Sequence, residues 1–132
     1  MIISGCKKIV GGSDEGRALV TAQPINFLAM VDTKTGTITD PRHELYEKSL
    51  KGSVLVFPYA IGSSVGAYVF YSLRENGTAP AAIVCSKADI TTASGCAIAN
   101  IPVVNLPEGS PAIKQGSVAK VDADGGRITV KV

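Results

Sequence analysis

Residues 52–74, GSVLVFPYAIGSSVGAYVFYSLR, decide the expected fold of this chain. Residues 53–57 lack charge and are rich in aliphatic side chains, which is typical of a strand buried on both faces of a parallel sheet. Pro58 cannot donate a backbone hydrogen bond, so the strand is expected to end there. Beyond a short connector, apolar residues recur at helical spacing, namely Val65, Tyr68, Val69 and Leu73. The stretch therefore predicts a strand, a turn and a helix.

Further β-structure is expected on both sides of this stretch. Before it, short strands are predicted at residues 7–10, 17–22, 27–31 and 37–39, with turns at 11–16 and 32–36. After it, strands at 81–85 and 101–105 flank a helix over 90–99 capped by Asp89, and a hairpin over 117–132 closes the chain, with Ile128, Val130 and Val132 alternating. The pattern predicts one α/β domain over residues 1–132, with a small parallel sheet and flanking helices packed on an antiparallel β layer or partial barrel.

The bulk composition favours a folded protein and excludes two classes of partner. The chain has 132 residues, of which 45% are hydrophobic and 18% charged, so a disordered tail is excluded. A net charge of +2, without a run of basic residues, argues against nucleic-acid binding. No signal peptide or stretch of eighteen apolar residues is visible, so we expect a cytoplasmic protein without a membrane partner.

Three cysteines are too few and too scattered for a disulfide framework or a complete metal site. Cys6, Cys85 and Cys96 have no CxxC spacing. Free, buried thiols are the simplest interpretation. The alternative is that one of them lies near a metal centre supplied by a partner.

Three interpretations compete for residues 62–66, Gly-Ser-Ser-Val-Gly. In the first, a serine only caps the helix. The second matches the G-x-S-x-G nucleophile elbow of α/β-hydrolases, but that site needs a histidine after the serine, and the single histidine, His43, precedes it. In the third, Ser63 is a general base whose alkoxide is stabilised by free N–H groups at the helix start. That role would also need cationic or metal help from another chain.

The most polar segment, residues 40–50, is predicted to be an irregular connection with a helical turn. It contains Arg42 and His43, which are candidates for substrate or subunit contacts, as is Arg17 in an earlier strand. Surface or hydrogen-bonded roles are the alternative for all three residues.

The sequence resembles the swivelling domain of the aconitase superfamily and, more closely, the small subunit of the aconitase X group. The resemblance covers most of the chain and rests on residues 12–21 (GSDEGRALVT), the 32–36 turn, Arg42-His43, residues 52–84, 88–90 and 101–104. It implies a swivelling β/β/α domain that pairs with a large subunit carrying an iron–sulfur cluster. In archaeal two-subunit members the activity is that of a hydro-lyase, phosphomevalonate dehydratase, which converts (R)-5-phosphomevalonate to trans-anhydromevalonate 5-phosphate in a mevalonate pathway to isoprenoids.

The resemblance also suggests roles for single residues. It implies that Ser63 is the proton acceptor and that its neighbours Ser64 and Gly62 contact a small phosphorylated hydroxy acid. Arg42 and His43 stay candidates for further substrate contacts. Val65 stands where ordinary aconitases have an arginine, so tricarboxylate recognition is not expected. Two alternatives stay open: another aconitase X dehydratase, such as one acting on cis-3-hydroxyproline, and a non-catalytic interaction domain.

Overall fold

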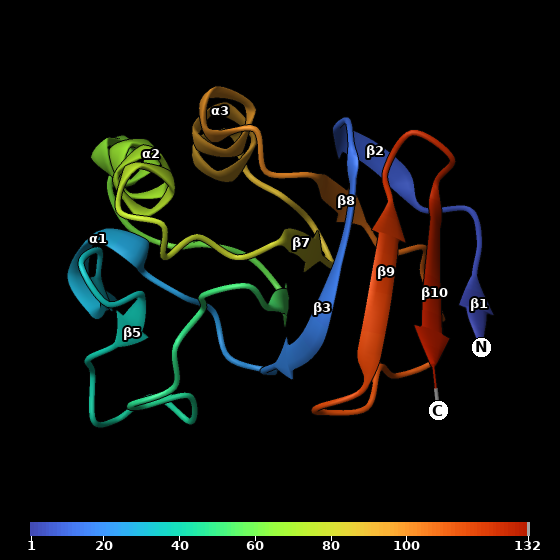
Figure 1. Cartoon of the computed structure of the whole chain (residues 1–132), viewed down its shortest axis with the longest axis horizontal. Helices are drawn as coiled ribbons and strands as arrows, with labels where there is room; N and C mark the ends of the chain where they lie inside the picture. Colours follow the sequence, from blue (N-terminus) through green and yellow to red (C-terminus); the bar gives the residue numbers. More distant parts are fainter. Residues whose placement is uncertain (132) are drawn as a thin grey trace.

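The strands of the chain form one large sheet and one small hairpin (Figure 1). The computed structural model describes residues 1–131, apart from the side chain of Ser64. Eight strands of this described part share the large sheet, in the order β1-β10-β9-β3-β6-β7-β8-β2. They are β1 (Ile2–Ile3), β2 (Lys7–Val10), β3 (Ser13–Val20), β6 (Val54–Phe57), β7 (Ala82–Cys85), β8 (Val103–Asn105), β9 (Val118–Asp122) and β10 (Arg127–Lys131). The hairpin pairs β4 (Val31–Asp32) with β5 (Thr37–Ile38).

The long strand β3 belongs to two layers of the molecule. Residues 13–17 pair antiparallel with β9, whereas residues 18–20 pair parallel with β6. The strands β7 and β8 continue the parallel part, and β10 and β1 continue the antiparallel part. One cluster of buried side chains comes from both parts, so the two parts face each other. The predicted packing of a parallel sheet on an antiparallel layer is therefore confirmed.

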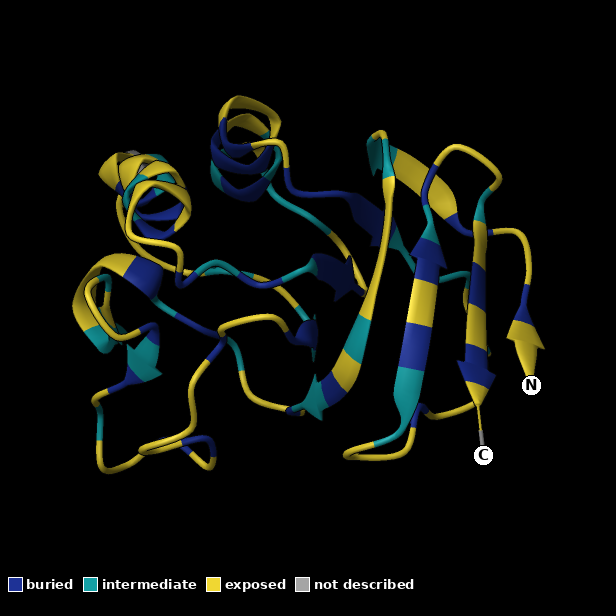
Figure 2. Cartoon of the chain, viewed as in Figure 1, coloured by how far each residue is buried: buried dark blue, intermediate teal, exposed yellow. Residues whose placement is uncertain are grey.

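Helices cover the other face of the parallel strands. They are α1 (Phe27–Met30), α2 (Ala67–Glu75) and α3 (Ile90–Ala99). Alternate strand residues such as Leu55 and Ile83 pack into a core beneath the helices, while their neighbours pack between the two β layers. Figure 2 shows the buried sides of α2 and α3 turned toward the sheet. The predicted β/β/α layering is thus confirmed.

The prediction of a strand at residues 27–31 is wrong, because most of this run forms the helix α1. The side chain of Asn26 caps that helix by accepting the backbone N–H of Ala29 at 3.1 Å. Phe27 is buried, with ring centroids 5.4 Å from Phe57 and 4.5 Å from Phe70. A run of five apolar residues has too little periodicity to distinguish helix from strand, so the cap and the aromatic contacts decide.

The prediction of a turn over residues 11–16 is also wrong for residues 13–16. β3 already begins at Ser13, and Gly16 lies inside it. A Cβ on Gly16 would lie only 2.2 Å from the carbonyl oxygen of Gly52. This glycine therefore permits a close backbone approach within the sheet, which is a tertiary contact that a local turn pattern does not distinguish.

Helix α2 confirms only half of the predicted apolar side, because Val69 and Leu73 are buried as expected and Val65 and Tyr68 are not. Its buried residues are Val69, Phe70 and Leu73. Val65 and Tyr68 were expected on that side, but their exposed fractions are 51% and 71%. Apolar residues occupy two adjacent sides of this helix, and helical spacing alone cannot indicate which side meets the sheet.

Other local predictions are confirmed. The Asp89 side chain accepts the backbone N–H of Thr92 at 3.1 Å and caps α3. Gly77 has a φ of +70° just after α2. β9 and β10 form the closing hairpin. Val132, the last residue of the predicted hairpin, lies outside the described residues. None of the helices in the described part is long and apolar enough to span a bilayer.

Candidate active site

The segment after β3 fixes the path of the connector between β6 and α2. The backbone N–H of Ile25 donates to the carbonyl of Tyr59 at 3.3 Å, and the N–H of Ile61 donates to the carbonyl of Ile25 at 3.0 Å. These bonds continue the parallel pairing of β3 and β6 beyond the ends of both strands. The connector therefore leads to Gly62 at the carboxyl edge of the parallel strands, the edge where α/β proteins usually bind ligands.

Gly62 fits this path because it has no side chain. Its φ is +108°, a value that residues with a Cβ rarely adopt. A Cβ at this position would also lie 2.8 Å from atoms of the Asn26 side chain, which is held in place as the cap of α1. The start of α1 thus packs against the turn before α2. No local pattern in the sequence indicates this contact.

Ser63 follows with an exposed side chain. Its Oγ accepts the backbone N–H of Val65 at 3.2 Å, and its carbonyl accepts the N–H of Gly66 at 2.9 Å. These bonds open the 3₁₀ turn η1 (Ser64–Gly66), which leads directly into α2. Through this hydrogen bond the Ser63 Oγ can cap the helix start. The same Val65 N–H can equally stabilise a negative charge on that oxygen. The side chain of Ser64, a predicted substrate contact, lies outside the described residues.

Arg42 lies on the same side of the molecule as the turn. It lines a surface depression of about 320 Å³ that also contacts Ile61, the residue before Gly62. The complete lining is Gln23, Pro24, Met30, Asp40, Arg42, His43 and Ile61. The Arg42 side chain is 89% exposed and forms two 3.2 Å contacts with Asp40. This hydrogen-bonded pairing holds the pKa of the Asp40 carboxyl below its ordinary value.

His43 is buried, with an exposed fraction of 6%. Its Nδ1 accepts the backbone N–H of Leu45 at 3.1 Å, so the proton of the neutral ring is assigned to Nε2, which lies 3.2 Å from the carbonyl of Pro24. Both ring nitrogens are therefore engaged within the chain. Pro24 comes directly before Ile25, whose backbone holds the connector. The contact between His43 and Pro24 therefore helps to fix the path of the turn.

A second support was not predicted from the sequence. The carboxylate of Glu44 accepts hydrogen bonds from the Thr21 hydroxyl and, at 2.9 Å, from the backbone N–H of Ala22. The Thr21 hydroxyl is the main cause of a lowered pKa at Glu44. In return, the side chain of Gln23 accepts the backbone N–H of Glu44 at 2.8 Å. The partners are about twenty residues apart in the sequence. The only feature of the sequence that could have indicated these hydrogen bonds was the polar character of residues 40–50.

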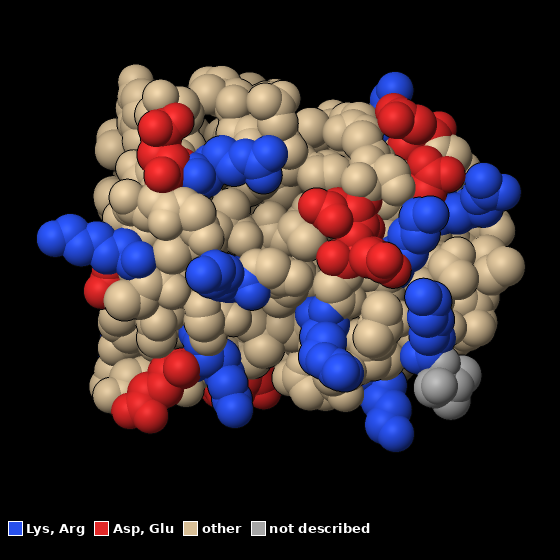
Figure 3. Space-filling view, viewed as in Figure 1, with Lys and Arg blue, Asp and Glu red and all other residues tan. Residues whose placement is uncertain are grey.

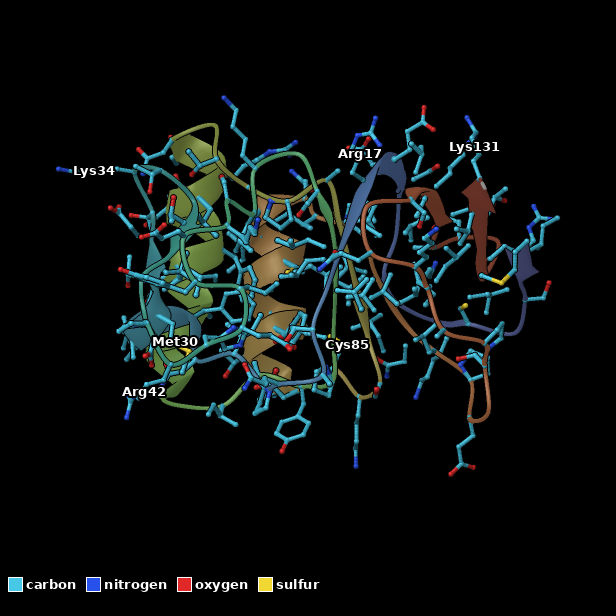
Figure 4. The ribbon with its side chains drawn as sticks, turned by 90° about the horizontal axis from the view of Figure 1, so that it is seen from below. Arg17, Met30, Lys34, Arg42, Cys85 and Lys131 are labelled. Atoms are coloured by element: carbon cyan, nitrogen blue, oxygen red, sulfur yellow. The ribbon has the colours of Figure 1, made fainter. Side chains whose placement is uncertain are left out.

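The structure does not bring Arg17 to the turn. Figure 4 shows Arg42 beside Met30 on one edge of the molecule, whereas Arg17 lies with Lys131 on the opposite edge. The Arg17 guanidinium donates to the carbonyl of Gly116 at 3.1 Å. Arg17 therefore belongs to another surface.

The three cysteines of this chain do not fit an iron–sulfur cluster. Cys6 belongs to the core between the β layers, whereas Cys85 and Cys96 belong to the core beneath the helices. All three are free and buried. Burial raises the pKa of Cys85 to about 12 and the pKa of Cys96 well above its usual range, so neither is poised to be a thiolate ligand. Within the described residues, no three His, Cys, Asp or Glu side chains gather to hold a metal ion.

The family described as "Aconitase X swivel domain" matches residues 3–130. The chain belongs to the aconitase X swivel-domain family. Its relatives in this family include the phosphomevalonate dehydratase small subunit of Methanothrix thermoacetophila, which is 47% identical over 119 residues, covering 89% of this chain and 87% of the relative. The protein of the same name from Thermococcus kodakarensis is 41% identical over 124 residues, covering 94% of this chain and 92% of the relative.

Solved structures of this swivel-domain family agree with the fold. A crystal structure of Thermococcus kodakaraensis aconitase X in its holo-form matches 100% of this chain and 99% of that chain, with a TM-score of 0.92 and 38% identity. A solution NMR structure of a UPF0107 protein matches the full length of both chains, with a TM-score of 0.91 and 38% identity. The resemblance to aconitase X, based on the sequence motifs, is thereby confirmed.

Proposed function

We propose that this chain is the small subunit of a two-subunit, cytoplasmic hydro-lyase that dehydrates (R)-5-phosphomevalonate to trans-anhydromevalonate 5-phosphate. The relatives from Methanothrix and Thermococcus, which match at 47% and 41% identity over most of both chains, are named as small subunits of phosphomevalonate dehydratase. Similarity at this level over the full domain supports the same activity here.

The position of the Ser63 hydroxyl is the main support for the proposed chemistry. It is exposed at the carboxyl edge of the parallel strands, and its Oγ already accepts one backbone N–H, from Val65. In the proposed reaction, Ser63 Oγ removes a proton from the carbon next to the substrate carboxylate. The electron pair of that C–H bond forms the double bond, and the bond from the neighbouring carbon to its hydroxyl breaks, so that hydroxide leaves. The proton taken up by Ser63 and this hydroxide together make up the water that is lost.

An alkoxide is a far stronger base than a serine hydroxyl, so its negative charge has to be stabilised. The Val65 amide supplies one hydrogen bond, and the positive end of the helix dipole adds a favourable field. Neither contribution requires a structural change, because η1 and α2 already have this geometry. The fixed path of the connector, secured by Asn26 and His43, keeps the hydroxyl in place.

Substrate contacts are proposed around the same turn. Arg42 is the exposed cation in the adjoining depression, and its planar guanidinium suits a carboxylate or phosphate group. Gly62 leaves room for close approach to the backbone, and Ser64 follows Ser63 at the helix start. His43 would contact substrate only if it released Pro24 or Leu45, so its proposed role is to support the turn.

We place the iron–sulfur cluster of the enzyme in the large subunit. The thiols of this chain are divided between two cores and do not fit a cluster. Such a cluster supplies a Lewis acid that assists loss of hydroxide from a substrate. The proton acceptor and the Lewis acid would then belong to different polypeptides, which explains why the small subunit alone is expected to be inactive.

Reconstitution tests the proposal. The chain is mixed with the large subunit of the same organism, and water loss from (R)-5-phosphomevalonate is followed by NMR. Turnover is expected for the pair and for neither subunit alone. Turnover of cis-3-hydroxyproline without turnover of phosphomevalonate would instead support the other aconitase X activity and refute this substrate assignment.

A further inference from the structure

A hollow of about 590 Å³ opens where β9 begins and β10 ends, at the lower right of Figure 1. The depression beside the Ser63 turn is smaller, at about 320 Å³, and the two share no lining residue. The walls of the hollow include the apolar side chains of Met1, Ala112, Val118 and Val130. This size and these apolar walls are typical of a site for a small molecule.

The charges around the hollow are of one sign. Among the lining residues that the structure describes, three are basic and none is acidic, namely Arg17, Lys114 and Lys131. All three are exposed. The whole chain has 13 basic and 11 acidic residues, so this is a local excess of positive charge. In Figure 3, basic side chains predominate over the lower ends of β9 and β10. The hollow therefore attracts anions.

Strand pairing places two of these cations in one row. Arg17 in β3 pairs with Val118 in β9, and Val118 pairs with Lys131 in β10. Paired residues of neighbouring strands share a face of the sheet, so the two cations flank the valine. Lys131 Nζ also lies 3.8 Å from the Glu15 carboxylate, but both side chains are more than half exposed. Such a pair contributes little, so Lys131 stays free to bind an anion.

The third cation lies on the turn of residues 114–117, which is fastened to β3. The Gln115 side chain accepts the backbone N–H of Val20 at 2.8 Å and donates to the carbonyl of Val20 at 3.1 Å. The carbonyl of Gly116 accepts the Arg17 guanidinium at 3.1 Å. The turn and the guanidinium are thus positioned without a ligand, which lowers the entropic cost of binding one.

We propose that this hollow binds a phosphate ester with a short aliphatic chain. Three positive charges suit a phosphate dianion better than a single carboxylate, and the planar Arg17 guanidinium can donate to two phosphate oxygens. The aliphatic chain would lie against the apolar walls at Val118 and Val130. The inference does not rest on the proposed function, because it uses no residue of the Ser63 turn or of the depression beside it.

An NMR titration of the full chain tests the proposal with three probes: n-hexyl phosphate, inorganic phosphate and hexanol. Saturable amide shifts are expected with n-hexyl phosphate, centred on residues 112–118 and 130–131. Burial of its chain should make it bind at least about tenfold more tightly than inorganic phosphate. Shifts centred elsewhere, or none, would overturn the proposal. Equal affinity for inorganic phosphate or for hexanol would also overturn it, since one half of the ligand would then be irrelevant.

Matched variants locate the charges. Lys114→Gln with Lys131→Gln should raise the Kd for n-hexyl phosphate at least about tenfold, because two charged contacts are lost. Lys34→Gln with Lys48→Gln removes the same charge from exposed positions, and Figure 4 shows Lys34 at the opposite edge of the molecule from Arg17 and Lys131. This control should change the Kd less than about twofold. Equal effects of the two double variants would overturn the site, because only the net charge would then matter.

A second variant tests the apolar wall. Val118→Thr keeps the shape of the side chain and its strand propensity but replaces a methyl group by a hydroxyl. The Kd for n-hexyl phosphate should rise about threefold while that for inorganic phosphate stays the same. An unchanged Kd for n-hexyl phosphate would count against the wall.

Calorimetry on the chain assembled with its large subunit repeats the measurement. Retained binding of n-hexyl phosphate supports a ligand site in the working protein. Loss of binding in the assembled pair would overturn the proposal, because the partner would then cover the hollow and the basic residues would be part of a subunit contact.

Discussion

Replacing Ser63 by alanine separates its role as a base from its role as a helix cap. The structure gives the Ser63 side chain one hydrogen bond, from the Val65 N–H at 3.2 Å, at an exposed position. Loss of an exposed cap costs about 0.5 to 1 kcal/mol of unfolding free energy. For a chain of 132 residues that corresponds to a fall in Tm of roughly 2 to 4 °C. A cap alone therefore predicts a small change in stability and full activity.

If Ser63 is the base, turnover should fall by a factor of about 10² to 10⁴ or more, because general base catalysis contributes that much. The assay is phosphomevalonate dehydration by the reconstituted pair, with the Kd for the large subunit measured alongside. Complex formation should be retained, since Ser63→Ala removes only one oxygen atom from the surface.

Ser49 provides a matched control. Its Oγ accepts the backbone N–H of Lys51 at 3.2 Å, which is the same two-residue contact that Ser63 makes, and it also donates to the carbonyl of Thr35 at 3.1 Å. Ser49→Ala should therefore cost at least as much stability while leaving turnover unchanged. A Ser63→Ala complex with more than about a tenth of normal turnover would refute the base assignment.

Two further predictions concern the supports of the turn. Gly62→Ala should lower the unfolding free energy by about 1 to 3 kcal/mol in urea titrations, because it adds both backbone strain and a clash with the Asn26 side chain. Gly77→Ala is the control, since Gly77 also has a positive φ but open space around it, and it should lower the unfolding free energy less. Equal losses for the two variants would contradict the clash with Asn26. Glu44 has a lowered pKa in the folded chain, so its stabilising effect is present above the ordinary value of 4.5 and is lost as pH falls through the folded value. The difference in unfolding free energy between the unchanged chain and Glu44→Gln should therefore shrink from pH 6 to pH 3, and a constant difference would count against the hydrogen bonds to Thr21 and Ala22.

Local signals were sufficient to predict the central unit of the fold. The strand β6, the turn and the helix α2 follow each other within 22 residues, and each has its own pattern of apolar, glycine and serine residues. The cap of α3 at Asp89 is equally local. Elements of this kind are decided by neighbours in sequence, so a single sequence predicts them well.

The errors occurred where distant residues decide the structure. Residues 27–31 form a helix because Asn26 caps it and Phe27 meets Phe57 and Phe70, and Gly16 lies in a strand because Gly52 approaches it. The turn at residues 62–66 could be predicted from its own residues. Its supports, Asn26 and the Thr21–Glu44 pair, could not, because each comes from a segment about twenty residues or more away from its partner.

The division of β3 between two layers has a consequence for biosynthesis. The antiparallel partner of residues 13–17 is β9, which a ribosome produces about a hundred residues later. Until β9 and β10 emerge, one edge of β3 stays open and the apolar side chains between the layers have no cover. A nascent chain halted before residue 118 is therefore expected to be prone to aggregation.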